Sequence, residues 1–318
     1  MGGHDLTAGQ PPQPPRARTE TVGEGDAGQR VDNYLLRHLK GVPRTRIYRI
    51  LRRGEVRVNG SRVKPSSRLA EGDLVRIPPV RVAARDAGPV AVQGLESNIL
   101  HEDDLLIVLN KPAGLAVHGG SGIRAGVIEG LRALRPKAEL ELVHRLDRET
   151  SGCLLVAKRR SFLRRVHALL RDQRGMHKEY VAVVAGRWPD VDMVDRPLST
   201  WVRGGGERRA RVDHESGKPS RTRFSVERVG AGMTLVRAEP VTGRTHQIRV
   251  HAASEGCPVI GDLKYGDDAR NARAREEFGV RRMLLHAERV TVNEPETGYT
   301  LEVHAPLDES MRSVINRL

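Results

Sequence analysis

The sequence feature that most constrains the fold is a polar nine-residue string that ends directly in an apolar run. The string is HRLDRETSG, residues 144–152, and the run is CLLVA, residues 153–157. A short run of branched apolar residues predicts a buried strand. Such a strand would hold Asp147 rigidly at its mouth, between Arg145 and Arg148, whose charges favour the ionised carboxylate. An ionised, positioned carboxylate serves as a nucleophile or a base, although a lone aspartate more commonly caps a turn or pairs with an arginine.

The composition indicates about two domains and an acidic partner. The chain has 318 residues, which is enough for a substantial core. Its formal net charge is +14, with a pI of about 10.5, so nucleic acid is the leading candidate partner. Arginine far outnumbers lysine, which suits bidentate contacts to phosphate, although a GC-rich coding sequence would give the same bias.

The sequence indicates neither membrane insertion nor a disulfide framework. Its start has no apolar signal core and no transit-peptide pattern. No apolar stretch approaches the roughly 18 residues that span a membrane. The two cysteines, Cys153 and Cys257, form no CxxC pair. We therefore expect a cytoplasmic protein with no membrane association, and we expect a monomer because no exposed apolar stripe stands out.

Changes in composition divide the chain into four segments. Residues 1–27 contain the run QPPQPP and little that could pack, which is typical of a disordered tail. Residues 80–98 mix Ala, Gly, Pro and charged residues without periodicity, which is typical of a linker. The two domains are expected over residues 28–79 and 99–318.

The first of these domains combines helices, a hairpin and many basic residues. Apolar residues at helical spacing predict helices over about 31–39 and 44–53. Short apolar and alternating runs predict strands over 55–58, 61–63 and 74–77, and Asn59-Gly60 predicts a tight turn between the first two strands. Three arginines, Arg46, Arg49 and Arg53, fall three and four residues apart on a different side of the second helix from its apolar face.

This helix–helix–hairpin unit resembles the S4 domain, a small RNA-binding module. The resemblance implies that the ridge formed by Arg46, Arg49 and Arg53 binds RNA phosphates, although for any one of these arginines a solvated helix face is the simpler interpretation. Phosphate contacts of this kind position RNA without reading its sequence.

The second domain is expected to be α+β. Short apolar runs predict strands over 105–109, 153–157, 180–185, 234–238 and 289–292. A helix is expected over 161–171, capped by Ser161, and another is expected to follow residue 243 and to close near Gly256. In the latter helix Ile248 and Ala252 are predicted to face inward, four residues apart.

Four segments of this domain resemble the motifs of the RluA-type pseudouridine synthases. They are residues 111–120, 144–152, 178–184 and 243–251, and the string around Asp147 is the most specific of them. The resemblance implies the pseudouridine synthase fold, a large mixed or mostly antiparallel sheet flanked by helices and loops. It also implies isomerisation of uridine to pseudouridine in RNA.

The resemblance assigns roles to individual side chains. It implies that Asp147 is the essential catalytic residue and that Arg249 pairs with its carboxylate. Tyr180 is expected to stack on the base, and uptake of the C5 proton is a second role considered for it. Ile248 would wall the pocket. Because the target nucleotide has to leave its helix or loop to reach the pocket, Arg145 or a nearby basic group is expected to fill the space it leaves. The further RNA-binding candidates are His118, Arg244 and His246.

The expected chemistry detaches uracil from C1′, turns it and rejoins it through C5. Asp147 would act at the ribose, by covalent capture or by removing a proton to give a glycal, and attack on uracil C6 remains an alternative. No redox step occurs, so no cofactor is expected. The expected partner is 23S ribosomal RNA, at several uridines near the peptidyl transferase centre, with other ribosomal or transfer RNA uridines as the alternative.

Three other interpretations fit parts of the sequence. Histidines such as His144 and His251 could be imagined as metal ligands with Asp147, but no HExxH or paired Cys/His spacing occurs, so no metal is expected. An S4-type ribosome factor without catalysis would not need Asp147, Tyr180 and Arg249. A ribonuclease would shorten RNA, whereas the isomerase leaves its mass unchanged.

Overall fold

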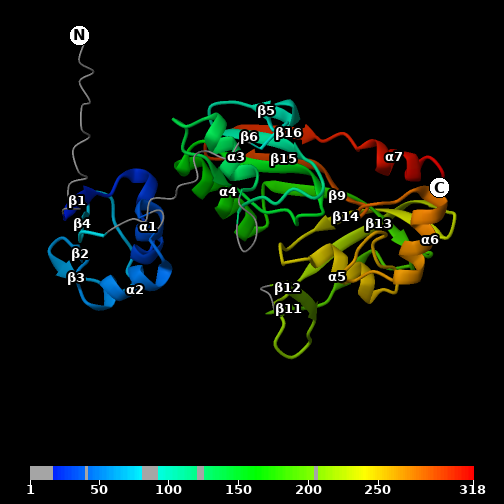
Figure 1. Cartoon of the computed structure of the whole chain (residues 1–318), viewed down its shortest axis with the longest axis horizontal. Coiled ribbons are helices and arrows are strands. Elements are labelled where there is room, and N and C mark those ends of the chain that lie inside the picture. Colours follow the sequence, from blue (N-terminus) through cyan, green and yellow to red (C-terminus); the bar gives the residue numbers. More distant parts are fainter. Residues whose placement is uncertain (1–16, 40–41, 81–91, 120–124, 204–206) are drawn as a thin grey trace, which may run out of the picture. The chain divides into compact units, whose positions relative to one another are not determined.

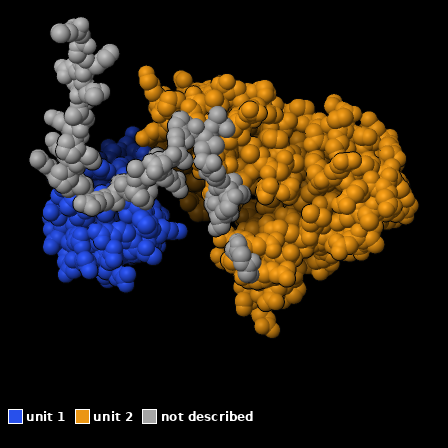
Figure 2. Space-filling view, in the orientation of Figure 1, with its two compact units in different colours: residues 1–88 blue, residues 89–318 orange. Residues whose placement is uncertain are grey.

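The computed structural model describes residues 17–39, 42–80, 92–119, 125–203 and 207–318. The chain divides into two units, residues 1–88 and residues 89–318, which are coloured separately in Figure 2. Each unit has its own hydrophobic core. No helix within the described ranges is long and apolar enough to cross a membrane.

Unit 1 places two helices against a small sheet (Figure 1). The helices are α1 (Val31–His38) and α2 (Arg44–Arg52). The sheet has the order β1-β4-β2-β3, from β1 (Arg18–Thr21), β4 (Leu74–Ile77), β2 (Arg57–Val58) and β3 (Ser61–Arg62). Asn59 and Gly60 have φ values of 49° and 77°, which confirms the predicted tight turn between β2 and β3.

The expectation of a disordered tail over residues 1–27 is wrong for its last part. Arg18–Thr21 form β1, which pairs antiparallel with β4, and Glu24–Asp26 form a short 3-10 helix, η1. Val22 is buried in the core of unit 1, so one apolar side chain anchors this segment. Residues 1–16 lie outside the described residues.

Unit 2 is built on a ten-stranded, mostly antiparallel sheet (Figure 1), as the resemblance implied. Its main path has the order β10-β13-β14-β9-β15-β8-β6-β5, with β16 beside β15 and β7 beside β8. Two further strands, β11 and β12, form a separate hairpin. The strand bounds are β5 Ile99–Glu102, β6 Leu106–Lys111, β7 Glu141–Leu142, β8 Ser151–Ala157, β9 Met176–Ala185, β10 Met193–Asp195, β11 Leu198–Val202, β12 Arg208–Val212, β13 Arg221–Gly230, β14 Met233–Pro240, β15 Leu285–Glu294 and β16 Tyr299–His304.

Helices cover both faces of this sheet. Their bounds are η2 Glu96–Asn98, α3 Val127–Leu134, α4 Arg160–Asp172, α5 Gln247–Ser254, α6 Asp268–Phe278 and α7 Glu309–Ile315. The strand predicted at residues 153–157 is confirmed as β8, whose seven residues are all buried because both of its faces are covered. Its alternate side chains enter two different clusters, Leu154 and Val156 in one and Cys153, Leu155 and Ala157 in the other.

Two local expectations for unit 2 are wrong. Ser161 does not cap α4, because the helix begins one residue earlier and Arg159 occupies the cap position without a side-chain hydrogen bond. The predicted linker over 80–98 extends too far along the chain, since Leu95 is 2% exposed and belongs to the core of unit 2. Residues 81–91 of that predicted linker lie outside the described residues.

One strand, β15, joins two strands that are distant from it in sequence. β15 lies between β8 and β9, antiparallel to β9 and parallel to β8. Gly152 of β8 faces Ala287 of β15 and has a φ of 106°, and a Cβ atom there would lie 2.2 Å from the Ala287 carbonyl oxygen. The backbone can approach this closely because residue 152 has no side chain.

Candidate active site

Asp147 lies in the loop between β7 and β8, and the residues around it are fixed. Leu146 on one side is buried in the main core cluster of unit 2. On the other side the Thr150 amide donates to the Asp147 carbonyl oxygen at 3.2 Å, and Thr150 is 2% exposed. The Asp147 side chain itself is 26% exposed, so a carboxylate on a rigid loop remains open to a ligand.

A buried lysine ties this loop to the first motif segment. Lys111 is fully buried, and its Nζ donates to the carbonyl oxygens of Pro112, Leu115 and Arg148 at 2.9, 2.9 and 3.0 Å. Burial lowers the pKa of Lys111 to about 7, and the charges of Glu149 and Asp147 oppose that shift. The three N–H groups of an ammonium match the three carbonyl acceptors, so Lys111 holds the two loops together.

One buried guanidinium is shared by two carboxylates. Arg249 Nη1 donates to Asp147 Oδ2 at 2.8 Å, while Nε and Nη2 donate to the two oxygens of Asp262, each at 2.7 Å. The Asp262 side chain is fully buried and that of Arg249 is 5% exposed. The bidentate pair with Asp262 therefore fixes the plane of the guanidinium and directs its Nη1 group at Asp147.

Helix α5 presents Arg249 from its first turn. His246 precedes the helix with φ 57° and ψ 21°, a left-handed conformation that is uncommon for residues other than glycine. Gln247 Oε1 accepts from the Arg244 amide at 3.0 Å and from Thr242 Oγ1 at 2.7 Å, which fixes the turn before the helix. Ile248 and Ala252 are buried, as their spacing predicted.

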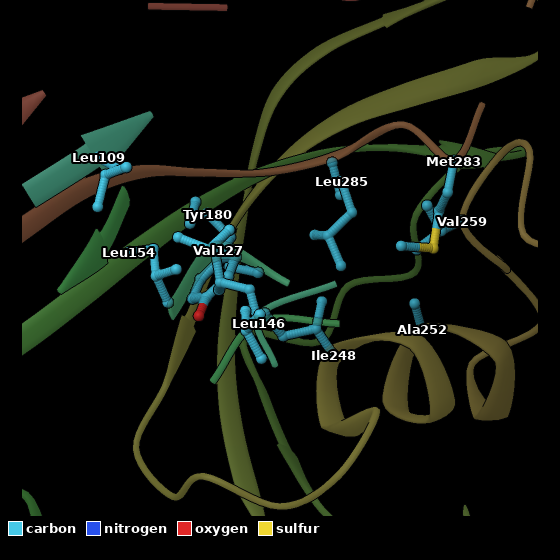
Figure 3. Close-up of a cluster of buried hydrophobic side chains, with 14 of the residues drawn as sticks. Leu109, Val127, Leu146, Leu154, Tyr180, Ile248, Ala252, Val259, Met283 and Leu285 are labelled. Carbon is cyan, nitrogen blue, oxygen red and sulfur yellow. The ribbon is translucent and has the colours of Figure 1, made fainter. Parts of the chain in front are cut away.

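The apolar floor of the site is continuous with the main core. Figure 3 shows Leu146, Tyr180 and Ile248 in one cluster, contributed by the Asp147 loop, by β9 and by α5. Leu146 and Ile248 each immediately precede a polar residue of the site, so burial of these apolar neighbours positions Asp147 and Arg249. Burial, reinforced by the charge of Asp147, raises the pKa of Tyr180 well above its usual value, so its phenol stays protonated at neutral pH.

Most of the predicted site residues line a common cavity of about 1570 Å³ in unit 2. These residues are His118, Arg145, Asp147, Tyr180, Arg244, His246, Ile248 and Arg249. Arg145 and Arg244 are exposed, and His118 and His246 are partly buried. Burial, with the charges of Arg145 and Glu129 acting in opposite directions, lowers the pKa of His118, which favours its neutral form.

The remaining predicted residues lie in unit 1. Arg46 and Arg49 are on α2, and Arg53 is at its C-terminal cap. Arg49 and Arg53 are exposed, and Arg53 Nη1 lies 3.8 Å from Glu55 Oε1. The side chain of Arg46 is partly buried.

The structure adds three residues that the sequence analysis did not single out. Lys111, Asp262 and Tyr265 each contact the loop or side chains that hold Asp147. The last two belong to GDLKYG, residues 261–266, a polar turn between glycines whose carboxylate could have been noticed as a second candidate. Within the described ranges, no three His, Cys, Asp or Glu side chains are placed to hold a metal ion.

Comparison with known proteins agrees with this geometry. Residues 105–254 match the family described as RNA pseudouridylate synthase, and residues 29–75 match the S4 domain. The chain is 52% identical over 305 residues to the ribosomal large subunit pseudouridine synthase C of Haemophilus influenzae, covering 94% of each sequence. This chain is a member of the pseudouridine synthase family. The protein of the same name from Escherichia coli strain K12 is also 52% identical, over 312 residues, covering 96% of this synthase and 97% of that relative.

Solved structures support the fold of the catalytic unit. Human RNA pseudouridylate synthase domain containing 4 superposes with a TM-score of 0.57 at 27% identity, covering 71% of this synthase and 94% of that chain. Human RNA pseudouridylate synthase domain containing 1 gives a TM-score of 0.55 at 26% identity, covering 70% of this synthase and 86% of that chain. The protein is thus an isomerase with an N-terminal S4 domain, and the fold class expected from the sequence is confirmed.

Proposed function

We propose that this synthase converts several uridines of 23S ribosomal RNA, near the peptidyl transferase centre, into pseudouridine. The support is the 52% identity, over almost the full length, to relatives named ribosomal large subunit pseudouridine synthase C. Other ribosomal or transfer RNA uridines are the second candidate. The same chemistry would serve there, since the roles proposed for the catalytic side chains concern the flipped nucleotide alone.

Asp147 is the proposed reacting group, and its pairing with Arg249 is the observation that carries the proposal. Breaking the bond between C1′ and N1 builds positive charge on the ribose, which a nearby carboxylate stabilises. The bond from C1′ then forms to C5, and a proton passes from C5 to N1, so all atoms balance without a cofactor. Covalent capture at C1′, a glycal and attack on C6 all remain compatible with this arrangement.

Tyr180 and Ile248 are proposed to form the apolar surface for the flipped base. Tyr180 is 7% exposed within the cluster that Ile248 also joins, so its ring is rigid. Because burial raises its pKa, the Tyr180 phenol is better suited to contact the base than to take up the C5 proton. Removal of that proton therefore falls to another group or to water.

The RNA is proposed to follow the exposed basic groups around the cavity. Arg145, two residues from Asp147, would fill the space left by the flipped nucleotide. Arg244 and the partly buried His118 and His246 would contact the strand beside it. In unit 1 the ridge formed by Arg46, Arg49 and Arg53 would bind phosphates and so raise affinity without reading sequence.

We further propose a cytoplasmic monomer, since ribosomal RNA is modified where ribosomes are assembled. The exposed large apolar side chains are spread over several elements, which favours a monomer. In the part of the chain that the structure describes, they are Leu74, Leu134, Trp201, Val202, Val226, Val229 and Leu263.

Chemical mapping of pseudouridine in 23S RNA tests the function. RNA from a strain lacking this synthase is treated with the purified protein or with its Asp147→Asn variant, which keeps the side-chain shape and removes the charge. The wild-type protein should restore pseudouridine at specific large-subunit positions, and the variant should restore none. Modification by the variant would refute the role of Asp147, and modification of transfer RNA alone would favour the second candidate.

A further inference from the structure

A chain of hydrogen-bonding groups leads from the hairpin β11–β12 toward Asp147. The Ala210 amide in β12 donates to Tyr265 Oη at 2.8 Å. Tyr265 Oη lies 2.7 Å from His246 Nδ1. The other ring nitrogen of His246, Nε2, lies 3.8 Å from Asp147 Oδ1. These contacts connect three parts of the sequence that are far apart.

The donors along this chain determine which nitrogen of His246 carries its proton. A phenol has one proton to donate, and Tyr265 Oη already accepts a hydrogen bond from Ala210. With the Ala210 amide on one lone pair of Tyr265 Oη, the arrangement that satisfies both groups directs the Tyr265 proton to the lone pair of His246 Nδ1. A neutral His246 then has its proton on Nε2, the nitrogen that faces Asp147.

The surroundings of Tyr265 make this arrangement rigid. Its ring packs with the small apolar cluster of Leu198, Ala210 and Val250, through which the hairpin contacts α5. The Arg249 guanidinium lies over the same ring, 5.0 Å from its centre. The left-handed backbone of His246, which normally costs free energy, is the further sign that this imidazole is held in place.

We propose that Tyr265 is a positioning residue that keeps His246 as a neutral Nε2–H donor to Asp147 Oδ1. Each oxygen of Asp147 would then have its own orienting donor, Arg249 at Oδ2 and His246 at Oδ1. The gap of 3.8 Å closes when substrate is bound, as hydrogen bonds at catalytic groups commonly shorten in the bound complex. The effect on turnover rests on the proposed function, whereas the tautomer is a property of the free protein.

The charges around His246 act in both directions. Burial lowers its pKa to about 4, and the charges that face it are Asp147 and Asp262, which raise the pKa, and Arg249 and Lys264, which lower it. The hydrogen bond from Tyr265 to Nδ1 also favours the neutral ring, because protonation would remove the accepting lone pair. Loss of the Tyr265 hydroxyl should therefore raise the pKa of His246 by about one unit.

Nitrogen-15 NMR of the full-length protein with labelled histidines tests the tautomer directly. Comparison with a His246→Gln variant assigns the His246 signals. The expected result is a neutral imidazole protonated at Nε2 from neutral pH down to about pH 5. A ring protonated at Nδ1 would overturn the proposal, and this outcome requires no other variant to fold.

Tyr265→Phe tests the positioning role, since it removes the hydroxyl and keeps the ring beneath Arg249. We expect His246 to sample both tautomers, kcat to fall about tenfold with KM changed less than about twofold, and the acid limb of the rate profile to move up by about one pH unit. Tyr299→Phe is the matched control, because Tyr299 Oη donates to Asp103 at 2.6 Å and does not line the cavity.

The outcomes separate this proposal from the proposed function. If Tyr265→Phe leaves the tautomer, kcat and acid limb as in Tyr299→Phe, Tyr265 is merely a packing residue. If the tautomer changes while kcat does not, the link to Asp147 is wrong. If Asp147→Asn remains active, the proposed function fails whatever the state of His246.

Discussion

Substitution of Asp262 by Asn tests whether the shared guanidinium positions Asp147. Asp262 Oδ2 accepts from Arg249 Nε, whereas Oδ1 accepts from Arg249 Nη2 and from the amides of Lys264 and Tyr265. In the variant, the Asn oxygen would keep the Oδ1 contacts. Its amide nitrogen would then point at the Nε–H group, so that two donors would face each other and Arg249 would have to turn.

The structure sets the size of the effect. Removing one partner of a buried ion pair costs about 3–5 kcal/mol, and the retained contacts of Oδ1 place Asp262→Asn near the lower end. A loss of about 3 kcal/mol lowers the melting temperature of a domain of this size by roughly 6–12 °C. A misplaced Arg249 should lower kcat by about 100-fold, with a much smaller change in KM.

Steady-state kinetics on a 23S RNA fragment, at a temperature well below the melting temperatures of the wild type and the variant, measure kcat and KM. Asp103→Asn is the matched control, since Asp103 binds Tyr299 and His101 in the same unit but does not line the cavity. The control should lose stability and keep its rate. If Asp262→Asn is folded and its kcat lies within about twofold of the wild-type value, the positioning argument is refuted.

Three further predictions concern stability and RNA affinity. Burial raises the pKa of Asp103, but hydrogen bonds from Tyr299, His101 and two backbone amides lower it to about 2. As pH falls from about 4 to about 2, the wild type should therefore lose about 2 kcal/mol more stability in urea than Asp103→Asn, which lacks this carboxylate and keeps the others. Gly152→Ala would place a Cβ atom 2.2 Å from the Ala287 carbonyl oxygen, so it should cost more than about 4 kcal/mol in thermal unfolding. Changing Arg46, Arg49 and Arg53 together to Gln should make the RNA-binding constant less sensitive to salt, reducing the magnitude of the slope of its logarithm against log salt concentration by about 2–3. Fluorescence anisotropy with labelled RNA measures this slope, and Asp147→Asn should keep its full wild-type value.

Local patterns in the sequence predicted the elements whose structure depends on near neighbours. The strand at 153–157 and the turn at Asn59-Gly60 follow from short runs of apolar or turn-forming residues. β1 was missed because RTET has no apolar alternation and depends on pairing with β4, more than 50 residues later. The cap assigned to Ser161 was wrong because a serine near a helix start does not by itself fix the first residue.

Single residues of the candidate site could be predicted from the sequence, but the contacts between them could not. Asp147 could be singled out from the string around it, and Tyr180 and Arg249 from their resemblance to family motifs. An arginine on a short helix is usually solvent-facing, so the burial of Arg249 could not follow from spacing. Its second partner, Asp262, is 13 residues further along, and only the turn between α5 and α6 brings the two together. The resemblance therefore pointed to the side chains proposed to react, and the structure shows which groups hold them in place.

The position of β15 has a consequence for how the synthase acquires activity during translation. β15 ends at residue 294 and separates β8, which follows Asp147, from β9, which carries Tyr180. A ribosome releases the chain from its N-terminus, so unit 1 emerges long before this strand does. Unit 1, with its basic helix α2, can therefore fold before the segments around Asp147 are assembled. The strand that follows Asp147 and the strand that carries Tyr180 are joined only when residues 285–294 insert between them.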